Sequence, residues 1–144
     1  MTTINDVYEN NHKIAERTKV ILYMIKNRSI CDADVTKDLL FGLIDQVKHQ
    51  MEVEESEFFK HMLTNHSVEI KTTANNFLSS SAEIKRVLKQ YLRRWTAHNS
   101  LRIKDHEAFI EDSNEVFEMV QNHIILKTEK LYPVVRSILH EVAA

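Results

Sequence analysis

The sequence predicts an all-α protein, folded as one domain over residues 1–144 in an antiparallel up-down-up-down four-helix bundle. The chain contains one Gly and one Pro among its 144 residues. β-Sandwiches and barrels need those residues at their many turns, and doubly wound α/β folds need Gly-rich loops. Hydrophobic residues make up 43% of the chain, which is enough for a core. Apolar residues recur at three- and four-residue steps along nearly the whole sequence, the period of an amphipathic helix.

The first half of the chain predicts two helices. The first follows an apolar stripe over residues 4–25 and ends at the polar segment 27–34. Within that segment, Asp32 or Asp34 is expected to cap the next helix, because aspartate is a favoured N-cap residue. The second helix follows a stripe over residues 40–62.

The second half predicts two more helices with the same period. A polar turn at residues 64–67 leads into a third stripe over residues 70–95. A connection near residues 98–105 then leads into a fourth stripe over residues 109–138. Four helices joined by short connections favour antiparallel neighbours, which is why the expected topology is up-down-up-down.

Two places leave the continuity of these helices open. Ser80 with Glu83, and Asp112 with Glu115, each match the capping-box pattern, so the third and fourth helices are either continuous or broken there. The third stripe keeps its phase through this region, which favours one continuous helix. Pro133 lies inside the fourth helix and removes one backbone donor, so we expect a kink or bend there.

Polar residues interrupt the apolar stripes at matching heights. They lie about 15–18 residues from the turns, or roughly 22–27 Å at the rise of an α-helix. These residues are His12, at the edge of the first stripe, and Gln50, Ser81 and His123. An antiparallel bundle would bring them into one layer across the core.

Two charged residues share the same inward faces. Glu54 and Lys127 follow Gln50 and His123 by one helical turn. A buried charge costs several kcal/mol unless it is compensated. We therefore expect an ion pair between the second and fourth helices. The alternative is that both side chains extend to the edge of the bundle.

The inward-facing residues form two short motifs. The second helix carries Glu54-Glu55-Ser-Glu-Phe58-Phe59, and the fourth carries His123-Ile-Ile-Leu-Lys127 followed by Leu131-Tyr132-Pro133. The chain thereby resembles the hemerythrin-like (HHE cation-binding) proteins, whose signature helices have the form His-x-x-x-Glu followed by a Leu-Phe-Pro type of triplet. The resemblance spans most of the chain. It implies a hemerythrin-like four-helix bundle around a di-iron or other metal site, serving oxygen, nitric oxide or iron chemistry and sensing.

The resemblance also implies which residues would hold the metal. His12, Glu54 and His123 match ligand positions, and His49 is a substitute ligand beside Gln50. The other ligand positions hold Gln50, Ser81 and Lys127. Amides and hydroxyls are poor iron ligands, and an ammonium repels a cation. We therefore expect a degenerate site with no cofactor, and iron on the matching ligands as the alternative.

A second, fainter similarity is to the bacterial anti-sigma family that sequesters the housekeeping sigma subunit. It rests on the stretch from His123 to Leu131 and on residues 105–109. This similarity implies a bundle that binds a protein without metal chemistry. The hypothesis from the sequence is a non-enzymatic binding or regulatory protein. Its alternative is an iron-binding protein that handles or senses oxygen, nitric oxide or iron.

The charge distribution bears on partners and location. The formal net charge is −2, which argues against nucleic acid as a partner. One face of the third helix is basic and carries Lys85, Arg86, Lys89, Arg93 and Arg94. That face is either solvated and paired with nearby acids or a docking face for an acidic protein. No apolar run reaches the roughly 18 residues of a membrane helix. The start of the chain is unlike a signal peptide, and one cysteine excludes an internal disulfide. We expect a cytoplasmic protein.

Overall fold

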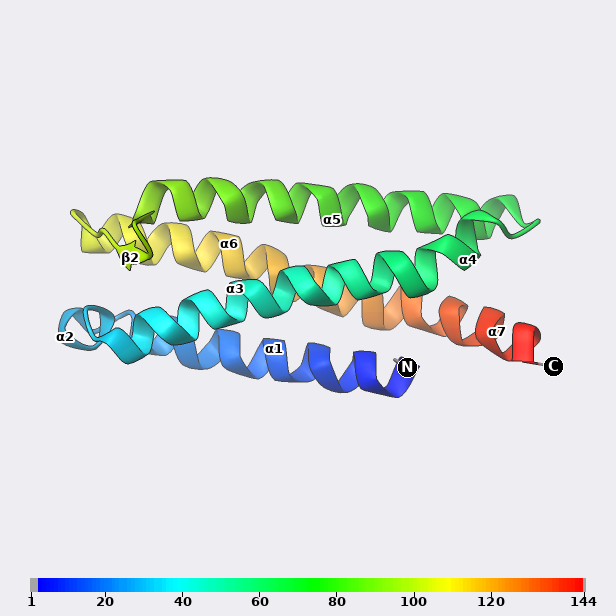
Figure 1. Ribbon diagram of the computed structural model, residues 1–144, viewed down its shortest axis with the longest axis horizontal. Coiled ribbons are helices and arrows are strands. Elements are labelled where there is room, and N and C mark those ends of the chain that lie inside the picture. Colours follow the sequence, from blue (N-terminus) through cyan, green and yellow to red (C-terminus); the bar gives the residue numbers. More distant parts are fainter. Residues whose placement is uncertain (1–2, 144) are drawn as a thin grey trace.

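Helices dominate the structure. The computed structural model describes residues 3–143 (Figure 1). Its longer helices are α1 (Ile4–Met24), α3 (Asp34–Glu54), α5 (Val68–Trp95), α6 (His106–Leu126) and α7 (Tyr132–Ala143). Its shorter elements are α2 (Arg28–Cys31), α4 (Lys60–Leu63), the π-helical segments η1 (Glu55–Phe59) and η2 (Lys127–Leu131), and the strands β1 (Thr96–Ala97) and β2 (Ser100–Leu101). The predicted all-α class is confirmed.

The cap predicted for the second long helix is wrong. Ala33 occupies the N-cap position of α3, and no side chain makes a capping hydrogen bond there. Asp34 is instead the first residue of the helix, where its negative charge is favourable to the helix dipole. Asp32 pairs with Arg28 across the short helix α2, with 3.1 Å between Nε and Oδ2.

The two possible breaks do not occur. α5 is continuous through Ser80, whose hydroxyl donates to the carbonyl oxygen of Asn76 at 3.0 Å, as a residue inside a helix does. α6 is continuous through Asp112. The Asp112 carboxylate accepts a hydrogen bond from the indole nitrogen of Trp95 at 2.6 Å, so it fastens α6 to α5 and caps neither.

The connection between α5 and α6 contains a small hairpin. Thr96 of β1 pairs with Leu101 of β2 in antiparallel register. The two residues between the strands, His98 and Asn99, have φ angles of 54° and 61°. A two-residue hairpin whose central residues both have positive φ matches the twist of the paired strands.

π-Helical segments interrupt the second and fourth helical stretches. In η2, the backbone N–H of Tyr132 donates to the carbonyl of Lys127, five residues earlier. Pro133 follows at once and lacks a backbone donor. One wider turn therefore lies directly before Pro133, after which α7 continues. The bend expected at this proline stays a prediction. A matching segment, η1, follows α3.

The long helical stretches lie lengthwise beside one another, and the chain reverses direction between them (Figure 1). α1 packs against α3 and α6, and α5 packs against α6. The reversals fall at α2, at the turn between α4 and α5, and at the hairpin. Within residues 3–143, no helix has both the length and the apolar character needed to span a membrane.

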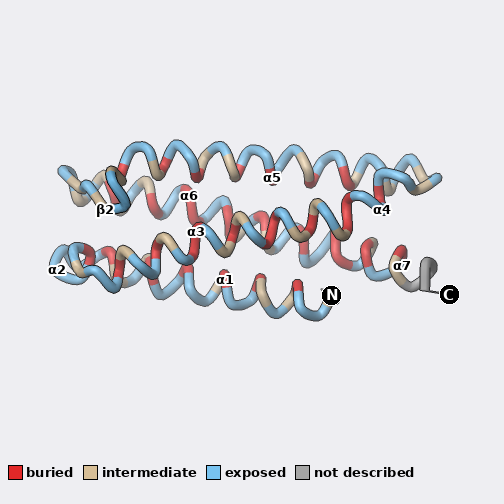
Figure 2. Tube along the Cα trace, in the orientation of Figure 1, coloured by how far each residue is buried: buried red, intermediate tan, exposed pale blue. Residues whose placement is uncertain are grey.

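The buried residues line the inner sides of the helices and form two apolar clusters (Figure 2). Along each long stretch the side chains change from one cluster to the other at a buried polar residue. These boundary residues are Asn11 on α1, Glu54 on α3, Ser81 on α5, and His123 and Lys127 on the last stretch. A polar layer therefore separates two halves of the core, and this layer is the candidate site.

Candidate functional site

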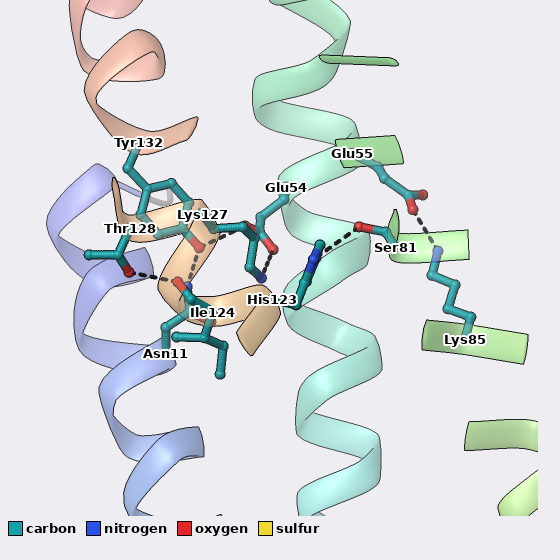
Figure 3. Close-up of polar contacts among 10 residues, drawn as sticks. All are labelled: Asn11, Glu54, Glu55, Ser81, Lys85, His123, Ile124, Lys127, Thr128 and Tyr132. Carbon is teal, nitrogen blue, oxygen red and sulfur yellow. Dashed lines mark hydrogen bonds and ion pairs between the residues drawn. The ribbon is translucent and has the colours of Figure 1, made fainter. Parts of the chain in front are cut away.

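A buried ion pair lies at the centre of the polar layer. Glu54 is the last residue of α3, and Lys127 is the first residue of η2. The Lys127 Nζ lies 2.7 Å from Glu54 Oε1, and the side chains are 3% and 1% exposed (Figure 3). The structure thus brings together the two charges that the sequence suggested as a pair, and neither extends to the edge of the bundle.

Two neutral side chains complete the surroundings of the Glu54 carboxylate. The Tyr132 hydroxyl donates to Glu54 Oε2 at 2.7 Å, and Asn11 Nδ2 donates to the Tyr132 oxygen. Burial, and secondarily the nearby Glu54 charge, raise the pKa of Tyr132 far above its ordinary value. The phenol therefore stays protonated at neutral pH, and both carboxylate oxygens have a donor. This support is what a buried charge needs to be tolerated.

His123 occupies the other side of the layer. Its Nε2 lies 3.3 Å from the hydroxyl oxygen of Ser81 on α5, and its ring centroid is 6.1 Å from that of Phe77. Burial, and secondarily the Lys127 ammonium, lower the pKa of His123 to about 3. The ring is therefore neutral at pH 7. It joins α5 to α6 by a hydrogen bond, and no Lewis acid is needed to hold it there.

Two of the sequence-predicted ligands point away from the layer. His12 is exposed on α1, and the adjacent Asn11 is the residue that faces the core. The expectation for His12 was wrong by one position, which turns a helical side chain by about 100°. His49 on α3 is exposed as well, while Gln50 is buried. The proposed ligand set of His12, Glu54 and His123, with or without His49, is not brought together.

The residues in the layer do not suit a metal ion. In the described part of the chain, no three His, Cys, Asp or Glu side chains lie where they could hold one. Gln50 and Ser81 face the layer but offer only an amide and a hydroxyl. Lys127 places a positive charge 2.7 Å from Glu54, the only carboxylate side chain that is buried among the residues the structure describes. A cation entering this site would meet that charge at close range.

Sequence reasoning missed two members of the network. Asn11 belongs to the buried stripe of α1, but the resemblance points to the adjacent His12, because histidine is a metal ligand and asparagine is a poor one. Tyr132 follows η2 and lies in a triplet that is apolar in the resemblance, which gives its hydroxyl no role. The available signal was a tyrosine about one and a half turns beyond a buried lysine. Buried tyrosine hydroxyls usually have a hydrogen-bond partner, so this tyrosine indicated a place in the network.

The basic face of α5 is partly neutralised by nearby acids. Lys85 pairs with Glu55 of η1 at 2.6 Å, which links two helices. Arg86 pairs with Glu83 in the same helix, and Arg94 pairs with Asp112 of α6. Lys89 and Arg93 are exposed and have no ion-pair partner among the described residues. The sequence suggested either a solvated face paired with nearby acids or a docking face. Three of the five cations are paired with acids, as the first interpretation predicts.

Comparison with known proteins adds no relative. No family model, no curated protein and no solved structure matches this chain.

The first prediction concerns the ion pair. Replacing Lys127 with Ala leaves the Glu54 charge buried and uncompensated, so the free energy of unfolding should fall by about 3–5 kcal/mol. The matched control is Lys85→Ala, which breaks a partly exposed pair and should cost about 0–1 kcal/mol. A double variant, Glu54→Leu with Lys127→Met, should recover much of the loss. Urea unfolding measures all three. Equal, small effects of the two Ala variants would show that the Lys127 ammonium is solvated.

The second prediction concerns His123 and pH. An unfolded histidine takes up a proton near pH 6.5, whereas folded His123 resists it down to a pKa of about 3. The unfolded chain therefore binds more protons between these values. The free energy of unfolding should fall as the pH falls through this window, by up to about 1.4 kcal/mol per pH unit.

Subtracting the profile of a His123→Gln variant isolates this contribution from that of the carboxylates. The control His49→Gln changes an exposed histidine and should follow the parent protein. NMR titration of the His123 ring gives an independent reading. A difference profile that stays flat between about pH 6.5 and pH 4 contradicts the prediction.

Proposed function

We propose that this chain is a non-enzymatic binding or regulatory protein, built on a hemerythrin-like up-down-up-down bundle in which an ion pair replaces the di-metal centre. One observation carries the proposal. A lysine ammonium lies 2.7 Å from the buried Glu54 carboxylate, and both side chains are at least 97% buried. In the family that the chain resembles, a metal cation would neutralise that carboxylate.

The arrangement of the chain supports the proposed topology. The long helical stretches lie side by side with reversals between them (Figure 1). A polar layer crosses the core, and Gln50, Glu54, Ser81, His123 and Lys127 occupy helix positions at which the resemblance places metal ligands, while Asn11 takes the place expected of His12. π-Helical turns begin directly after Glu54 and at Lys127, and such turns are frequent at functional sites in helices.

The size of the buried space leaves no room for an organic substrate inside the polar layer. The cavity inside the polar layer measures about 10 Å³. Organic substrates occupy pockets of roughly 300–1,000 Å³. Glu54 and His123 are engaged with Lys127, Tyr132 and Ser81, so both are held by their neighbours. The outer faces are then the surfaces available for binding.

Among these faces, we assign the partner contact to α5. Lys89 and Arg93 lie one turn apart on it. The other cations of this face are already paired with acids of the same chain. An acidic protein segment would complement the remaining pair, with an effect that falls as salt rises.

A metal assay tests the first part of the proposal. Protein purified from iron-supplemented cells is expected to carry substoichiometric iron, because Lys127 already compensates Glu54. Lys127→Glu supplies a second carboxylate and should either unfold the bundle or raise the affinity for iron. Lys127→Met, which removes the charge without adding a ligand, is its control. Two irons per chain with an oxo-bridge absorption band would overturn the proposal in favour of an iron protein.

A charge-reversal experiment tests the second part. Lys89→Glu with Arg93→Glu should abolish low-salt binding of an immobilised poly-glutamate probe. The control Lys26→Glu with Lys130→Glu makes the same change in net charge at exposed positions outside α5. It should bind like the parent protein. If both variants lose binding equally, the effect belongs to net charge, and α5 is not the docking face.

A further inference from the structure

The polar layer encloses a small cavity. It measures about 10 Å³ and lies among α1, α3, α5 and the last helical stretch. Its polar lining residues are Asn11, Gln50, His123 and Lys127, and the rest of its wall is apolar. This volume is close to the smallest that admits one water molecule.

Two polar atoms of this lining lack a partner. Asn11 Oδ1 and Gln50 Nε2 are buried, and neither has a hydrogen-bond partner among the described residues. The residues that carry them are 2% and 3% exposed. An unsatisfied buried polar atom costs about 1–3 kcal/mol. The two atoms are complementary, because one is an acceptor and the other a donor.

Lys127 adds unused donors at the same place. An ammonium has three hydrogens. Its hydrogen bond to Glu54 Oε1 uses one of them. The residues that line the cavity therefore carry one acceptor atom and one donor atom without a partner, and Lys127 has further hydrogens to donate.

We propose that this cavity is a binding site for one water molecule, which donates to Asn11 Oδ1 and accepts from Gln50 Nε2. A neutral molecule that both donates and accepts at one atom satisfies both orphan groups at once. An anion would leave Asn11 Oδ1 without a donor and would add a negative charge near Glu54. A cation would face Lys127, and an apolar gas would satisfy neither amide.

The structure also assigns an entrance to this site. An open cleft of about 450 Å³ runs between α5 and α6, with Ser80 and Asn122 among its lining residues. His123 and Ile84 line both this outer cleft and the inner cavity. Their side chains form the wall between the two spaces. The water exchanges with solvent past His123, and movement of this ring controls the exchange.

A crystal structure of the full chain at high resolution tests the site. One ordered solvent atom is expected within hydrogen-bond distance of both Asn11 and Gln50. Gln50→Leu should lose this atom and lower the melting temperature. The control Gln46→Leu, on the same helix but in contact with Arg17 outside the layer, should keep it. A direct bond between the two amides, or an empty cavity bounded by them, would overturn the proposal.

Water exchange in solution tests the entrance. Oxygen-17 relaxation should detect one long-lived water in the parent protein and its loss in Gln50→Leu. His123→Ala opens the wall and should shorten the residence time. Val120→Ala is the matched control, because Val120 lines the inner cavity but not the cleft. Equal shortening by both variants would overturn the assigned entrance. Neither result depends on the proposed function, since a dry cavity leaves the metal assay unaffected.

Discussion

The contact between Glu54 and Lys127 is the constraint around which the rest of the structure is arranged. Removing either charge from water costs several kcal/mol, and their attraction offsets this only with good geometry and additional hydrogen bonds. The chain meets that requirement with Tyr132 and, behind it, Asn11. These groups come from α1, α3, η2 and α7. α3 and the last helical stretch are thereby fixed at one height, because a displacement of either would leave a buried charge unpaired. A displacement of α1 would break the hydrogen bond from Asn11 to Tyr132.

The same layer divides the hydrophobic core. One apolar cluster lies toward the hairpin and contains Trp95 and Phe109, and the other contains Phe58 and Tyr132. Apolar packing alone is tolerant of sliding, since one leucine-sized residue fills much the same space as another. Directional hydrogen bonds and a charge pair are less tolerant. A polar layer costs stability but selects one alignment of the helices, a role best attested for polar residues in coiled coils.

Much of this arrangement follows from helical periodicity, and the parts that do not follow have physical reasons. The 3.6-residue period identified Gln50, Glu54, Ser81, His123 and Lys127 as inward-facing, and all are buried. It failed at His12, because adjacent residues on a helix differ by about 100° in direction, so that Asn11 faces the core and His12 does not. It gave no role to Tyr132, because a phenol has an apolar body and its partner lies 78 residues away in the chain. The absent cap on α3 also escaped prediction, since Asp32 and Asp34 were equally suitable.

The π-helical segments make the helical stretches that carry Glu54 and Lys127 tolerant of a change in chain length. A π-helical turn is a single wider turn within an α-helix, and it accommodates one extra residue. Normally a single insertion or deletion in a helix rotates every later side chain away from its partners. Here η1 begins directly after Glu54 and η2 begins at Lys127, and both segments carry residues of the cluster that contains Phe58 and Tyr132. The wider turns therefore fall where the ion pair meets that cluster. At these two points the wider turns accommodate the extra residue, and an α-helix continues beyond each of them as α4 and α7.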